Sequence, residues 1–173
     1  CVAYTRVDGD FHAFSAKSIV LATGGSTRCW SVCSGSWEYT GDGHALALWA
    51  GAELRDMEFV QFHPTGMVWP PSVRGILVTE GVRGEGGRLT NSDGDRFMFN
   101  YVPEMFQGDH AETIEEADQW VDEVVSGKLA TVRRPPELLT RDVVAKAIKA
   151  EVEAGRGSPH GGAFLDISHR GEE

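Results

Sequence analysis

Residues 18–25 have the sequence SIVLATGG, in which a short apolar run leads directly into two glycines. A continuous apolar run of this length is typical of a strand that is buried on both faces. In open α/β sheets, ligands bind beyond the carboxyl ends of such strands. The stretch therefore predicts a central strand over 18–22 and a ligand-binding turn at 23–25 in an α/β fold.

The segments on either side fit a mixed α/β chain. Residues 2–6 and 11–14 alternate around an Asp-Gly turn and predict a hairpin. The sequence TGDG at 40–43 predicts the start of a helix that ends near Gly51. Free N–H groups at a helix start suit an anion, although the motif alone favours an ordinary cap by Thr40 or Asp42. No GxGxxG motif is present.

Two more helices and several short strands are expected further along the chain. The sequence TIEE at 113–116 matches a capping box, and apolar residues follow at helical spacing up to Gly127. A second helical pattern runs over 143–152 and ends at Gly155. Residues 53–61, 75–78 and 163–167 predict strands.

Composition limits the class of protein. The 173 residues are 41% hydrophobic and carry a net charge of −10, which is ordinary for a soluble domain and disfavours nucleic acid as a partner. The apolar runs are too short to cross a bilayer. The three cysteines form no zinc-type pattern, the histidines show no HxxxH spacing, and so no metal site is predicted. An odd cysteine count favours a reducing cytoplasm.

Two glycine-rich stretches combine side chains suited to a small anion. Residues 61–66 read QFHPTG and residues 79–87 read TEGVRGEGG. Glycines let a backbone approach a ligand closely, and the charged and hydroxylated side chains among them predict a binding site. The alternative is a pair of turns with solvated charges, in which Glu80 and Arg83 form a surface salt bridge and His63 is structural.

Five stretches, in this order, resemble the flavoprotein subunit of succinate dehydrogenase and fumarate reductase. They are ATGG at 22–25, YTGDG at 39–43, QFHPTG at 61–66, LVTEGVRGEGG at 77–87 and RDVV at 141–144. Each is weak alone, but together they span nearly the whole chain. L-aspartate oxidase shares much of this pattern, including residues 164–169, whereas HPTGM at 63–67 favours the succinate dehydrogenase branch.

The resemblance implies a fold with two parts. Residues 1–58 would be part of a Rossmann-like FAD-binding domain, and residues 59–173 an α+β capping domain with an inserted helix at about 112–127. The chain would be a fragment of an FAD-dependent succinate dehydrogenase, because the family's first dinucleotide-binding turn and flavin-attaching histidine have no counterpart in these 173 residues. The fragment alone would be inactive.

The resemblance also assigns roles to single residues. His63 and Thr79 would bind a dicarboxylate, succinate or fumarate. Arg141 would exchange a proton with the substrate carbon while hydride passes to the flavin, with Glu80 and Arg83 as the proton relay. The residues near FAD would be Thr23, Gly24, Gly25 and Asp42.

Partners and alternatives follow from the same likeness. The family implies two partner proteins, a membrane anchor and an iron–sulfur subunit. It also implies a place in the cytoplasm or at the cytoplasmic face of the inner membrane, within the tricarboxylic acid cycle and electron transport. Two alternatives stay open: an L-aspartate oxidase-like flavoenzyme, and a non-catalytic cap module without bound FAD.

About 30 extra residues, from about Gln107 to Pro136, separate the Glu80 group from Arg141 when the chain is compared with shorter family members.

Overall fold

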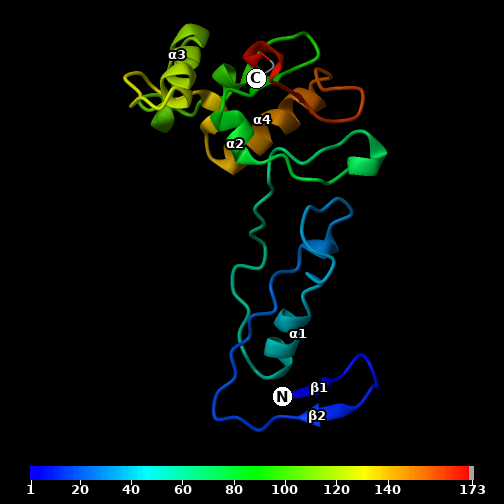
Figure 1. Ribbon diagram of the computed structural model, residues 1–173. Coiled ribbons are helices and arrows are strands. Elements are labelled where there is room, and N and C mark those ends of the chain that lie inside the picture. Colours follow the sequence, from blue (N-terminus) through cyan, green and yellow to red (C-terminus); the bar gives the residue numbers. More distant parts are fainter. Residues whose placement is uncertain (172–173) are drawn as a thin grey trace. The chain divides into compact units, whose positions relative to one another are not determined.

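The computed structural model describes residues 1–171 and divides the chain into two compact units. The N-terminal unit comprises 1–31 and 35–57 and contains β1, β2 and α1 (Figure 1). The C-terminal unit comprises 32–34 and 58–173, of which residues 172 and 173 lie outside the described part. Within residues 1–171 no helix has the length and apolar character needed to cross a membrane.

The N-terminal unit begins with the expected hairpin. β1 (Val2–Tyr4) pairs with the antiparallel strand β2 (Phe11–Ala13). Gly9 sits in the turn at φ 80°, a backbone conformation that glycine adopts without steric penalty. The hairpin prediction is confirmed.

The helix predicted after the TGDG motif is α1 (Asp42–Trp49). Its N-cap is Gly41, at φ 85°, and no side chain caps the helix, so neither Thr40 nor Asp42 acts as the ordinary cap. Gly51, at φ 90°, follows the last turn, and the amide of Ala52 donates to the carbonyl of Ala47 at 3.0 Å. The positive φ explains why a glycine ends this helix.

Three predicted strands are wrong in the structure. Residues 18–22 form no strand, and Ile19, Val20 and Leu21 are exposed. Residues 53–61 form none either, and 75–78 contribute only one bridge, between Leu77 and Gly66. An apolar run becomes a buried strand only where neighbouring strands pair with it and helices cover its faces, and among the described residues nothing pairs with 18–22.

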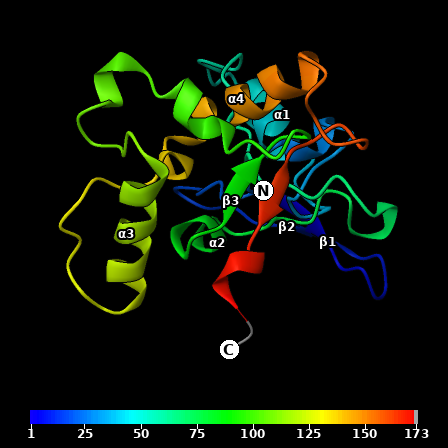
Figure 2. The same ribbon diagram turned by 90° about the horizontal axis from the view of Figure 1, so that it is seen from above.

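The C-terminal unit contains a second antiparallel pair. β3 (Arg88–Thr90) lies beside β4 (Phe164–Asp166), with Leu89 opposite Leu165 (Figure 2). β4 confirms the strand expected at 163–167. The described residues therefore form a mixed α/β structure with two small antiparallel sheets.

Three helices belong to the C-terminal unit: α2 (Glu80–Gly84), α3 (Ile114–Val125) and α4 (Arg141–Glu153). α3 and α4 confirm the two helical patterns. Thr113 caps α3 by accepting a hydrogen bond from the amide of Glu116 at 3.2 Å. Short 3-10 turns make up the remaining elements of the described residues, one in the N-terminal unit (Thr27–Cys29) and the others in the C-terminal unit: Pro71–Val73, Phe97–Tyr101, Glu104–Phe106, Pro136–Leu138 and Ser168–Arg170.

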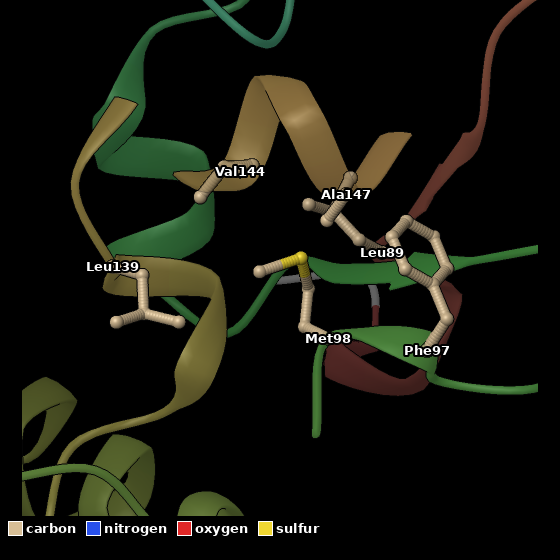
Figure 3. Packing of buried hydrophobic residues seen from close by; sticks show 6 residues of the cluster. All are labelled: Leu89, Phe97, Met98, Leu139, Val144 and Ala147. Carbon is tan, nitrogen blue, oxygen red and sulfur yellow. The ribbon is translucent and has the colours of Figure 1, made fainter. Parts of the chain in front are cut away.

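The core of the C-terminal unit lies between β3, the 3-10 turn at Phe97–Tyr101, and α4. Six buried apolar side chains interlock there (Figure 3). Because Leu139 and Val144 belong to this core, the segment between them, which carries Arg141, is held on both sides. The members are Leu89, Phe97, Met98, Leu139, Val144 and Ala147.

Candidate functional site

Charged side chains from two helices meet in the C-terminal unit. Glu80 is the first residue of α2 and Arg141 the first residue of α4. The Oε2 atom of Glu80 lies 3.5 Å from Nε of Arg141 and 3.6 Å from Nη2 of Arg83. One carboxylate thus sits between two guanidinium groups, and the structure brings together three residues that the sequence motifs place in one site.

Arg83 is the most unusual member of this group because it is almost completely buried. Its residue exposure is 1%, and its Nη1 donates to the backbone carbonyl of Glu137. Nε and Nη2 make no hydrogen bond to any described residue, although Nη2 is within ion-pair distance of Glu80. Burial lowers the pKa of Arg83, Glu80 opposes this shift, and Arg141 adds to it. Buried charges with unused donors are concentrated at functional sites.

Arg141 is held at two atoms. Its Nε faces Glu80, and its Nη1 donates to Oε1 of Gln61 at 3.3 Å. No role was expected for Gln61 from the sequence, although it lies in the QFHPTG stretch. Residues two apart in extended chain face the same side, so the position of Gln61 two residues before His63 was the available signal.

The charges of Glu80, Arg83 and Arg141 affect the pKa of the nearby residue His63. Partial burial lowers the pKa of His63, Arg141 and Arg83 lower it further, and Glu80 raises it. The imidazole is therefore mostly neutral at pH 7. Its Nδ1 atom lies 3.3 Å from both the backbone nitrogen and Oγ1 of Thr65.

Thr79 stands directly before Glu80 and caps α2. Its Oγ1 accepts a hydrogen bond from the amide of Gly81 at 3.4 Å. An accepting hydroxyl keeps its own proton for a further partner. Thr79 is exposed, so this proton can be donated to an incoming anion.

Behind the cluster, buried ion pairs fix the segment that precedes α4. The carboxylate of Glu137 is 0% exposed and receives Nε of Arg96 at 2.6 Å and Nη2 at 3.1 Å. Arg96 also reaches Asp118 of α3 at 2.9 Å. Through Arg96, α3 is thus tied to Glu137, the residue whose backbone carbonyl holds Arg83.

The cluster is open to solvent in this unit. The side chains of Glu80 and Arg141 are 50% and 44% exposed. A cavity of about 520 Å³ in the same unit has mainly apolar walls, and none of Glu80, Arg83 and Arg141 lines it. A ligand on the charged cluster would therefore need a second surface to exclude water.

The predicted cofactor residues lie together in the N-terminal unit. Thr23 and Gly24 line a pocket of about 240 Å³ with Gly43 and His44 of α1. A Cβ atom at Gly24 would lie 2.6 Å from the ring of Tyr39, and a Cβ at Gly43 would overlap Thr23. The 23–25 turn is therefore packed against the start of α1, and only glycine permits the contact.

This packing fits one part of a dinucleotide site. α1 presents free amides at its N-terminus, where a helix attracts anions. Asp42 lies in the first turn, and Gly25 has open space where a side chain would be. Among the residues that the structure describes, no group of three or more His, Cys, Asp or Glu side chains is arranged to hold a metal ion.

Comparison with known proteins gives consistent matches. Residues 1–173 match the model of the FAD binding domain family. The chain is 47% identical over 161 residues to a fumarate reductase (CoM/CoB) subunit of Methanothermobacter marburgensis, covering 93% of this chain and 24% of that protein. It is 38% identical over 176 residues to the succinate dehydrogenase flavoprotein subunit of Rickettsia bellii, covering 99% and 24%.

Solved structures of related proteins are also similar to this chain. A quinol-fumarate reductase with menaquinol molecules superposes with a TM-score of 0.74 at 37% identity, over 99% of this chain and 26% of that chain. Sdh1 of Mycobacterium smegmatis in complex with UQ1 superposes with a TM-score of 0.60 at 54% identity, over 97% and 23%. The chain thus spans about a quarter of the length of these relatives.

Proposed function

The chain belongs to the FAD binding domain family, and from this premise we propose that the complete protein is an FAD-dependent oxidoreductase that interconverts succinate and fumarate. The observation that carries the proposal is Glu80 held between Arg83 and Arg141 in a chain 47% identical to a fumarate reductase subunit. Residues 1–58 would belong to a Rossmann-like FAD-binding domain and residues 59–173 to a capping domain.

The N-terminal unit would contribute to FAD binding. Thr23, Gly24 and Gly25 would let the backbone approach the cofactor, and Asp42 would lie near it at the start of α1. When bound, FAD supplies the acceptor for a hydride, which is chemistry that no amino-acid side chain provides.

Substrate binding would use the cationic character of the cluster. Two guanidinium groups flank one carboxylate, which leaves one net positive charge to attract a dianion, and the nearby imidazole of His63 can donate a hydrogen bond to it. His63 and Thr79 would donate hydrogen bonds to the carboxylates of succinate or fumarate.

Proton transfer would run through Arg141. A guanidinium almost never loses a proton in water, but a dry site and an adjacent carboxylate make the exchange easier. Glu80 is placed to take or return the proton of Arg141 at 3.5 Å and to share it with Arg83 at 3.6 Å. Positioned proton transfer of this kind contributes about 10²–10⁴-fold to rate.

Electron transfer partners are part of the proposal. Two solved relatives are described with a quinol or with UQ1. We expect the complete protein to pass electrons to an iron–sulfur subunit held by a membrane anchor at the cytoplasmic face of the inner membrane.

The direct test replaces Arg141 in the complete protein. Arg141→Lys keeps the positive charge but loses the planar fork that reaches both Glu80 and Gln61. We expect succinate turnover to fall by at least about 10²-fold, with the flavin content unchanged. Arg74→Lys, at an exposed arginine of the same unit, should keep full turnover. Near-normal turnover of the Arg141 variant would refute the assignment.

A further inference from the structure

Thr65 is a buried residue beside the cluster that the proposed mechanism does not use. It is 7% exposed. Its Oγ1 donates to the backbone carbonyl of Val78 at 2.8 Å, and its own carbonyl accepts from the amide of Val78 at 2.9 Å. Thr65 thus fastens the segment that carries His63 to the segment that carries Thr79 and Glu80.

The same threonine presents two groups to the imidazole. Its backbone nitrogen and its Oγ1 both lie 3.3 Å from Nδ1 of His63. A hydroxyl has one proton, and here that proton is donated to Val78. Only an Oγ1 lone pair therefore faces Nδ1, next to an N–H that can only donate.

The backbone N–H and Oγ1 of Thr65 can each form a hydrogen bond with a different protonation state of the His63 ring. The backbone N–H of Thr65 donates to Nδ1 when that atom carries a lone pair, as in the neutral Nε2–H tautomer. Oγ1 accepts from Nδ1–H when the ring is protonated. No described residue forms a hydrogen bond with Nε2, and Nε2 is not a buried atom.

We propose that Thr65 is a positioning residue that holds His63 in one orientation in both protonation states, so that Nε2–H is always offered to a substrate carboxylate. The inference rests on the proposed function, in which His63 binds a dicarboxylate. It adds that binding the dianion draws a proton onto His63 without any rotation of the ring.

The charges around His63 make this proton uptake depend on substrate. Burial, Arg141 and Arg83 lower the pKa of His63, and Glu80 raises it. A carboxylate of the substrate beside Nε2 adds a second negative charge and favours the imidazolium. The Nδ1 proton then has an acceptor already in place at Oγ1.

The test uses four variants of the complete protein with succinate as substrate. Thr65→Val keeps the backbone and removes the hydroxyl, and we expect KM to rise on the order of tenfold with kcat nearly unchanged. Thr65→Ser restores the hydroxyl and should return KM to the wild-type value. In the His63→Gln background, adding Thr65→Val should raise KM no further, because Thr65 acts through His63.

Three outcomes separate the possibilities. An equal rise in KM from Thr65→Val in both backgrounds would overturn the inference, since Thr65 would then act only on the 78–80 segment. A wild-type KM for Thr65→Val would overturn it as well. A wild-type KM for His63→Gln would instead refute the proposed substrate site itself.

A second measurement does not depend on the folding of any variant. In wild-type protein labelled with [¹⁵N]histidine, the imidazole nitrogen shifts report the tautomer of neutral His63. We expect the Nε2–H tautomer without substrate and the imidazolium when fumarate, which the oxidised enzyme cannot turn over, is bound to it. The Nδ1–H tautomer, or a ring that stays neutral with fumarate bound, would contradict the inference.

Discussion

Glu80 is the negative charge that lies between the cationic side chains of the candidate site. It faces Arg141 at 3.5 Å and Arg83 at 3.6 Å, and its field opposes the lowering of the pKa of His63. A carboxylate in this place repels a dicarboxylate while it offers a route for a proton. Binding and turnover should therefore respond to its removal in opposite directions.

Glu80→Gln tests this at the residue scale. The amide keeps the size of the side chain but carries no charge and takes up no proton. We expect kcat with succinate to fall by about 10²-fold or more and KM to fall as well, because repulsion of the dianion is removed. Steady-state kinetics on the complete protein measure both values.

Glu85→Gln is the matched control for this variant. Glu85 is exposed and caps the other end of α2. It should leave kcat and KM as in the wild type. A Glu80→Gln protein with normal kcat would contradict the proposed relay.

The sequence motifs contain the main residues of the candidate site but give no sign of the residues that support them. His63, Glu80, Arg83 and Arg141 stand in recognisable motifs. The roles of Thr65 and Glu137 depend on backbone carbonyls 13 and 54 positions from their partners. No local pattern reports such a contact, because it exists only after the chain has folded.

At the scale of elements, α4 is fixed by a polar network near its C-terminal end. Glu151 is 2% exposed and accepts hydrogen bonds from Asn91 at 3.0 Å, Tyr101 at 2.6 Å and Arg156 at 2.7 and 2.8 Å. The hydrogen bonds from Arg156 lower the pKa of Glu151 to about 2. α4 carries Arg141 at its other end, so this network supports the site.

Glu151→Gln should lower the free energy of unfolding by about 1–3 kcal/mol at pH 7. The folded-state pKa of Glu151 is depressed, so its contribution is present above about pH 4.5 and is lost as the pH falls toward about 2. The variant should therefore lose less stability than the wild type over this range. Denaturant unfolding at several pH values measures the difference.

Glu153→Gln provides the comparison on the same helix. Glu153 is 66% exposed and pairs only with Lys149 among the described residues, at 3.5 Å. Exposed i,i+4 pairs contribute about 0.3–0.5 kcal/mol, so this change should be small. Equal losses for the two variants would contradict a special role for the buried network.

The stability of the C-terminal unit should also depend on its apolar core. Met98 is 0% exposed and lies among the residues that pack α4 (Figure 3). Met98→Ala should lower the free energy of unfolding by about 2–5 kcal/mol. Met105→Ala, at a side chain 79% exposed, should change it very little. A similar loss of unfolding free energy in both variants would contradict the assignment of Met98 to the core.

The elements that could be predicted are those with strong local signals. Thr113 and the apolar stripe after it define α3, and the Asp-Gly turn defines the β1–β2 hairpin. Residues 18–22 carry the composition of a buried strand but lack a partner among the described residues. Strand formation depends on pairing with distant segments, and a single stretch of sequence does not contain that information.

At the scale of the molecule, each unit contains its own group of candidate site residues. The N-terminal unit packs the 23–25 turn against α1, and the C-terminal unit gathers the charged cluster. The sequence contains no GxGxxG motif, which Rossmann-type dinucleotide-binding folds use for the phosphates. We expect residues 1–173 alone to bind no FAD, and a flavin absorbance spectrum of the purified chain checks this.

Anaerobic titration of the complete, FAD-containing protein with succinate shows whether the charged cluster is a dicarboxylate site. If the cluster of His63, Glu80, Arg83 and Arg141 binds a dicarboxylate against the flavin, succinate should bleach the flavin absorbance and fumarate should restore it. L-aspartate at the same concentration should leave the spectrum unchanged. Bleaching by L-aspartate alone, or by neither compound, would contradict the account.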